Sequence, residues 1–194
     1  MSVAIRSRAR AVVALLVLGA GALAAASATW LRTSVSTALE PEVAVEVTGT
    51  TAAPGVAAAA FVVVAGALAT TLGGSLARRV ALVVAAGGGL GITASAVAVL
   101  LDAEGPAVLG ASDVAGVTEL ASPVQVTLLP WLAALAGALV VVVAVLALLG
   151  AGSWAATGGR HERAGTAEAR PAAEPDPQAD WDALSRGTDP SSDR

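Results

Sequence analysis

Four long apolar stretches, each bounded by charged residues, dominate the chain. An α-helix rises about 1.5 Å per residue, so about 20 apolar residues cross a hydrocarbon core of about 30 Å. Each stretch reaches this length and has no charged residue in its interior. The pattern therefore predicts four membrane-spanning helices, at about residues 11–31, 56–77, 80–101 and 128–149.

The composition supports the same interpretation. Apolar residues make up 56% of the chain and charged residues 13%, with a mean hydropathy of +0.76. Soluble domains are roughly 45–50% apolar and about 25% charged. We therefore expect an all-α integral membrane protein, a four-transmembrane-helix bundle, with the lipid bilayer as its solvent.

The first apolar stretch also fits a second interpretation. Arg6, Arg8 and Arg10 precede it, and residues 26–28 read Ala-Ser-Ala, which is the outline of a cleavable secretory signal peptide. The stretch is longer than the apolar part of a usual signal peptide, and Trp30 stands where an interfacial aromatic anchor is expected. Cleavage would leave three spans in the same orientation.

The arginines predict the orientation. Cytoplasmic flanks of membrane helices are enriched in Arg and Lys. With both termini in the cytoplasm, only Arg32 lies outside, and the second and third spans join at a turn over residues 77–80. We therefore predict a multi-pass protein of the plasma membrane with cytoplasmic N- and C-termini. The cytoplasmic arginines would be Arg6, Arg8, Arg10, Arg78, Arg79, Arg160 and Arg163.

The outer loops contain short stretches of alternating apolar and polar residues, the period of a half-buried strand. Residues 30–36 and 42–48 flank a turn region with Pro41, and residues 124–128 add a third stretch. We expect a small extracytoplasmic hairpin or sheet. Its role stays open between a lid that orders the helix ends and a surface for a ligand or partner.

The chain divides by composition into a four-span domain, residues 1–157, and a tail, residues 158–194. The tail is rich in charged residues, Pro, Ala and Gly, so we expect a disordered cytoplasmic segment. A short motif at 180–190 breaks this pattern, because Trp181 and Leu184 would share one face of a helical turn. That face could bind a cytoplasmic protein partner or the membrane surface, although chance or packing against the protein's own helices explains it equally well.

The residues needed for chemistry are scarce. The chain has no cysteine, and its one histidine, His161, follows the last span, so no metal site or catalytic triad is expected. No ionisable residue lies inside a span, which argues against an ion-coupled pump. We expect neither an enzyme nor a nucleic-acid-binding protein, and no cofactor. In the third span, Gly87 and Gly91 form a G-x-x-x-G pair suited to helix packing within or between chains, and the oligomeric state stays open.

Several motifs are spread along the chain: Val47-Thr48-Gly49, Pro130-Trp131, Arg160-His161-Glu162-Arg163 and the closing segment from Trp181 to Pro190, with Leu184, Gly187 and Asp189. Together they resemble the actinobacterial tryptophan-operon-associated membrane protein family, over nearly the full chain. The sequence departs from one of these motifs at His161, where an aromatic residue is common. The resemblance implies a link to tryptophan biosynthesis but no catalytic residues.

Two functional hypotheses follow. The first is a non-enzymatic membrane protein whose tail recruits a cytoplasmic partner. The second is a transporter or permeability factor for tryptophan or an indole-like metabolite, which could cross between Gly-rich helices without buried charges. The residues expected to bind a partner are Trp181, Leu184, Arg186 and Asp189.

Overall fold

The computed structural model of the chain describes residues 7–37, 40–158 and 185. Four of its helices are long and apolar enough to cross a membrane, which confirms the predicted fold class of a four-span helical protein. Apart from Gly158 and Ser185, the C-terminal tail that is predicted to be disordered lies outside the described part. The four helices are α1 (Arg8–Ser27), α3 (Pro54–Leu72), α4 (Ser75–Leu101) and α6 (Leu129–Gly158).

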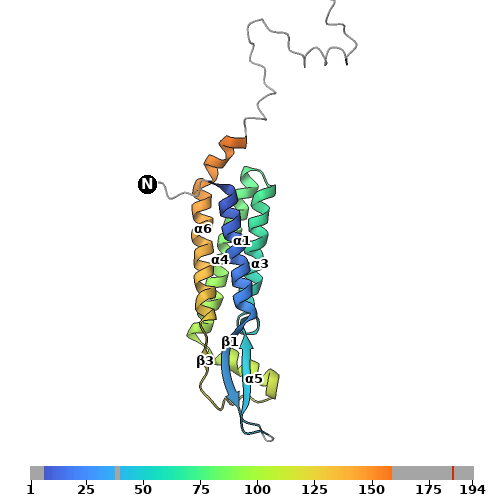
Figure 1. The fold of residues 1–194 in the computed structure, drawn as a ribbon, viewed down its shortest axis with the longest axis vertical. Helices are drawn as coiled ribbons and strands as arrows, with labels where there is room; N and C mark the ends of the chain where they lie inside the picture. Colours follow the sequence, from blue (N-terminus) through green and yellow to red (C-terminus); the bar gives the residue numbers. More distant parts are fainter. Residues whose placement is uncertain (1–6, 38–39, 159–184, 186–194) are drawn as a thin grey trace, which may run out of the picture. The chain divides into compact units, whose positions relative to one another are not determined.

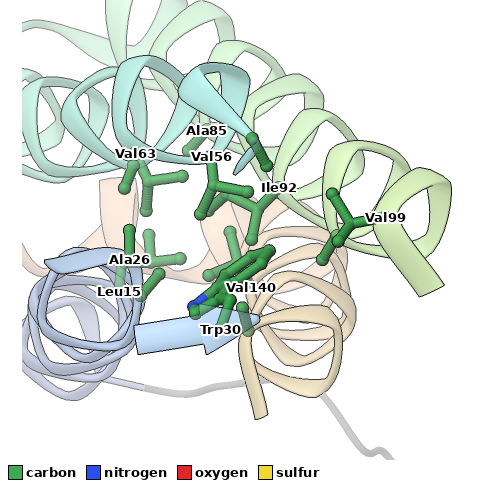
Figure 2. Close-up of a cluster of buried hydrophobic side chains, with 14 of the residues drawn as sticks. Leu15, Ala26, Trp30, Val56, Val63, Ala85, Ile92, Val99 and Val140 are labelled. Carbon is green, nitrogen blue, oxygen red and sulfur yellow. The ribbon is translucent and has the colours of Figure 1, made fainter. Parts of the chain in front are cut away.

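The four long helices form a bundle in which each packs against two others (Figure 1). Helix α1 lies between α3 and α6, and α4 contacts the same two helices from the other side. Fully buried side chains meet in the interior, among them Leu15, Val63, Ile92 and Val140, one from each helix (Figure 2). Large apolar side chains such as Phe61, 63% exposed, cover the outside, as expected where the surrounding solvent is lipid.

The helix ends differ from the predicted spans. Helix α6 continues to Gly158, beyond the predicted end at residue 149, and two further differences lie at the end of α1 and at the turn between α3 and α4. Helix α1 ends at Ser27, and the four residues after it are extended. The turn between α3 and α4 lies at Gly73 and Gly74, so residues 77–80, predicted as a turn, belong to α4. Glycine is among the poorest helix formers, whereas arginine is among the better ones, which favours the break at the glycine pair.

A three-stranded antiparallel sheet lies beyond one end of the bundle, in the order β2-β1-β3 (Figure 1). This sheet was predicted from the alternating loop stretches, and its presence is confirmed. Strands β1 and β2 form the hairpin, and β3 pairs with β1 from the second long loop. The strands are β1 (Thr29–Val35), β2 (Val43–Thr48) and β3 (Gln125–Val126).

Two short helices complete this end of the molecule. Helix α2 (Gly49–Ala52) follows β2 directly, and α5 (Glu104–Ala115) packs across β2 and β1. Helix α5 approaches the sheet at Gly110, where a Cβ would lie 2.5 Å from the Val47 side chain. We call the sheet with α2 and α5 the cap.

Candidate functional site

Trp30 joins the cap to the bundle. Its side chain is fully buried, and in Figure 2 it lies with side chains contributed by the bundle helices, such as Ile92 and Val140. The indole Nε1 donates a 2.8 Å hydrogen bond to the backbone oxygen of Ala25 in the last turn of α1. The prediction of an interfacial anchor at Trp30 is therefore wrong, because the strand that follows α1 turns this side chain into the protein. Trp131, 60% exposed near the start of α6, is an aromatic residue of the described chain that is available to a membrane interface.

Glycines of α4 bring three helices into close contact. A Cβ at Gly88 would lie 3.0 Å from the backbone oxygen of Ala59 in α3. A Cβ at Gly89 would lie 2.8 Å from the backbone oxygen of Gly137 in α6. The Thr93 hydroxyl donates to Gly89 O at 3.0 Å and lies 3.3 Å from Ala134 O of α6. Small residues and a hydroxyl at a helix interface are a common way to hold membrane helices together.

The predicted pair Gly87 and Gly91 is divided in this bundle. Gly91 faces α3, where a Cβ would lie 3.2 Å from the Ala59 Cβ. Gly87 is exposed, and a Cβ there would have no neighbour within 4 Å. The close contacts within the chain are therefore made by the two adjacent glycines, Gly88 and Gly89, while a contact of Gly87 between chains stays a prediction.

The predicted partner-binding residues of the tail, Trp181, Leu184, Arg186 and Asp189, lie outside the described residues. The tail motif is therefore a sequence-based prediction only.

In the described residues, acidic and basic side chains lie mostly at opposite ends of the helical bundle. All of its acidic residues lie in the cap or at its border, together with Arg32, which pairs with Glu46 at 3.2 Å across the β1–β2 register. The other arginines lie at the opposite end of the bundle. Both members of the Arg32–Glu46 pair are more than half exposed, so the pair contributes little to stability. The arginines of the far end are Arg8, Arg10, Arg78 and Arg79.

Hydroxyl groups fix the second long loop to the sheet. Ser122 Oγ accepts a 2.9 Å hydrogen bond from the Ser34 backbone N–H and lies 3.0 Å from Ser34 Oγ. Thr33 Oγ1 donates to the Ser122 backbone oxygen at 2.9 Å. Because Thr33 and Ser34 are buried, these bonds satisfy polar groups that have little access to water.

A hollow of about 440 Å³ with mixed polar and apolar walls lies where the cap meets the bundle. Gly55 and Ser95 approach closely in its wall, since a Cβ at Gly55 would lie 2.6 Å from Ser95 Oγ. Asp102 borders the hollow, and its Oδ1 accepts a 3.1 Å hydrogen bond from the Gly105 N–H at the start of α5. The hollow is large enough for a small solute.

Two apolar grooves run along the outside of the bundle. One, of about 620 Å³, lies between α1 and α6, and the other, of about 650 Å³, lies between α3 and α4. In the residues that the structure describes, no cluster of three or more metal-binding side chains is found.

The contact between Trp30 and Gly49 was not predicted from the sequence. It depends on a strand that turns back over the end of α1.

The family model of tryptophan-associated transmembrane proteins matches residues 4–191, which is nearly the whole chain. Neither the curated proteins nor the solved structures contain a match. With four apolar helices of spanning length and this match, the chain belongs to the tryptophan-associated transmembrane protein family.

Proposed function

We propose that the chain is a rigid, non-enzymatic membrane scaffold whose C-terminal tail recruits a cytoplasmic partner connected with tryptophan synthesis. The observation that carries the rigid scaffold is the packing of α4, whose backbone meets α3 at Gly88 and α6 at Gly89 without room for a side chain. Close-packed interiors have few alternative arrangements, so the bundle favours a fixed support over a moving gate. The partner role rests on the sequence of the tail.

The scaffold lies in the plasma membrane with both termini in the cytoplasm. The arginines at one end of the bundle and the acidic residues at the other support this orientation, because membrane proteins keep arginine on the cytoplasmic side. The packing of α1 between α3 and α6, with Leu15 fully buried, supports a first span that stays in the mature protein.

The tail supplies the contact with a partner. Trp181 and Leu184 are isolated apolar residues in a polar segment, spaced to share one helical face. Buried aromatic side chains dominate the binding energy of many protein interfaces. The full-length protein, solubilised in detergent and used as bait in cell extract, should retain a specific partner that Trp181→Ala loses.

The control for this experiment is Ser191→Ala, which changes the tail but leaves Trp181 and Leu184 in place. The control should retain the partner. Retention of the same proteins by Trp181→Ala would rule out recruitment through this motif, and the rigid bundle would then need another role.

A second candidate function is favoured by the groove between α3 and α4. Its wall includes Gly66 and several alanines, which leave room on the membrane-facing side for an apolar aromatic solute. In this alternative, the protein assists the passage of tryptophan or an indole-like metabolite. Labelled tryptophan and anthranilate, followed inside and outside deletion and wild-type cells, separate the two functions. A changed distribution with normal biosynthetic enzyme activity favours permeation, and an unchanged distribution favours the scaffold.

A further inference from the structure

The groove between α1 and α6 has an arginine at one end and apolar walls along the rest of its length. Arg10 lies in the first turns of α1, and the residues that follow along the groove are apolar. On the α6 side the wall is formed by Leu139 and Val143. The groove residues of α1 recur at helical spacing, at Arg10, Val13, Ala14 and Val17.

The two described arginines of α1 have different roles. The Arg8 guanidinium donates a hydrogen bond to the backbone oxygen of Thr71, which ties the start of α1 to the end of α3. Arg10 is exposed and makes no hydrogen bond or ion pair with the described residues. A cation at the N-terminus of a helix is also disfavoured by the helix dipole, which attracts anions there. Arg10 therefore lies where an anionic group would find both a favourable helix end and a guanidinium that has no partner among the described residues.

The length of the groove fits one leaflet of a bilayer. From Arg10 to Leu18, α1 advances about 12 Å at 1.5 Å per residue, and one leaflet contributes about 15 Å of hydrocarbon. We propose that this groove binds an anionic phospholipid, with the phosphate on Arg10 and one acyl chain along the apolar wall. The occupant is chosen by charge complementarity at Arg10 and by the apolar length beneath it.

The groove between α3 and α4 provides an internal comparison. It has a similar volume, about 650 Å³, and its wall is formed by apolar residues such as Val62, Leu76 and Val84. No arginine belongs to that wall. Acyl chains should occupy it without preference for the headgroup, whereas the α1–α6 groove should select anionic lipid.

Native mass spectrometry of the intact protein in detergent tests this proposal. Phosphatidylglycerol and phosphatidylcholine with identical acyl chains are titrated separately into the wild type and into Arg10→Gln. Losing one basic contact at a membrane surface weakens binding about fivefold, so Arg10→Gln should bind phosphatidylglycerol about fivefold more weakly. The loss for phosphatidylcholine should be smaller, because its choline cation offsets the charge of the phosphate. Arg79→Gln removes an exposed arginine of the same end that lies outside the groove wall, and should bind both lipids as the wild type does.

A second variant tests the acyl-chain part of the site. Ala14→Leu places a larger side chain in the groove wall without removing a charge, and should weaken the binding of phosphatidylglycerol. Equal affinity of the wild type for the two lipids would overturn the proposal. An equal loss of affinity for phosphatidylglycerol in Arg10→Gln and Arg79→Gln would also overturn it. Unchanged binding in Ala14→Leu would also overturn it, because the chain would then lie elsewhere.

Discussion

The indole Nε1 of Trp30 donates a 2.8 Å hydrogen bond to the backbone oxygen of Ala25, five residues earlier in the chain. The last carbonyl groups of a helix have no partner within the helix, so this bond closes the end of α1 with the first strand of the cap. The ring also lies against Gly49, the first residue of α2, whose missing side chain makes room for it. One buried side chain thus connects α1, β1 and α2.

Gly49→Ala should destabilise the protein. The new Cβ would overlap the Trp30 ring and lie 2.9 Å from the backbone oxygen of Ala26, and overpacking of this kind costs about 1–3 kcal/mol. The measurement is thermal unfolding of the purified protein in detergent, where a lower Tm than the wild type is expected. Gly21→Ala is the control, since a Cβ there meets nothing within 4 Å. Equal Tm values for the two variants would contradict the contact.

Gly89→Ala and Gly87→Ala should differ although the two glycines are near neighbours in one helix. A Cβ at Gly89 would lie 2.8 Å from both the Gly137 oxygen and the Val140 Cγ1, so α6 would have to shift. A Cβ at Gly87 would lie in open space. We expect Gly89→Ala to lose about 1–3 kcal/mol of stability and Gly87→Ala to lose none, as measured by unfolding in detergent. A larger loss for Gly87→Ala would show instead that Gly87 is a contact between copies of the chain.

The spans and the small sheet were predictable because their signals are local. Long uncharged apolar stretches are typical of membrane-spanning helices, and alternating residues such as Val43, Val45 and Val47 indicate a half-buried strand. The burial of the Trp30 side chain was not predictable from local sequence signals. An aromatic residue at the end of an apolar stretch is equally compatible with a lipid interface and with burial, and only the pairing of β1 with β2 decides between them.

Two further features depend on tertiary contacts. Helix α5 begins with Glu104-Gly105-Pro106 and contains Gly110, which is weak helical sequence, and it is stabilised by packing on β2 and β1. Residues 87–89 are all glycine, so composition could not show which of them faces a neighbouring helix. The neighbours are set by the positions of α3 and α6, and these place Gly88 and Gly89 inside and Gly87 outside.

Ser122→Ala should loosen the loop between α5 and β3 from the sheet. The substitution removes the acceptor of the buried Ser34 N–H, and an unsatisfied buried donor costs about 1–3 kcal/mol. Hydrogen–deuterium exchange should therefore become faster in the peptide that contains β1. Ser112→Ala removes an exposed hydroxyl that bonds only within α5, to Leu109 O, and should leave this exchange unchanged. Protection of β1 as in the wild type would mean that the loop does not hold the strand.

The proposed orientation predicts which end of the bundle a reagent reaches from outside the cell. Because the chain has no cysteine, a single introduced thiol reports on its own position without background from the protein. Glu42→Cys lies at an exposed position directly before β2 of the cap, and Arg79→Cys lies at the arginine-rich end. A membrane-impermeant maleimide should label Glu42→Cys in intact cells and Arg79→Cys only after permeabilisation. The reverse pattern would place the acidic cap in the cytoplasm, against the distribution of arginine. An even number of spans puts both termini on the same side of the membrane as Arg79. In that orientation the tail could not bind a cytoplasmic partner.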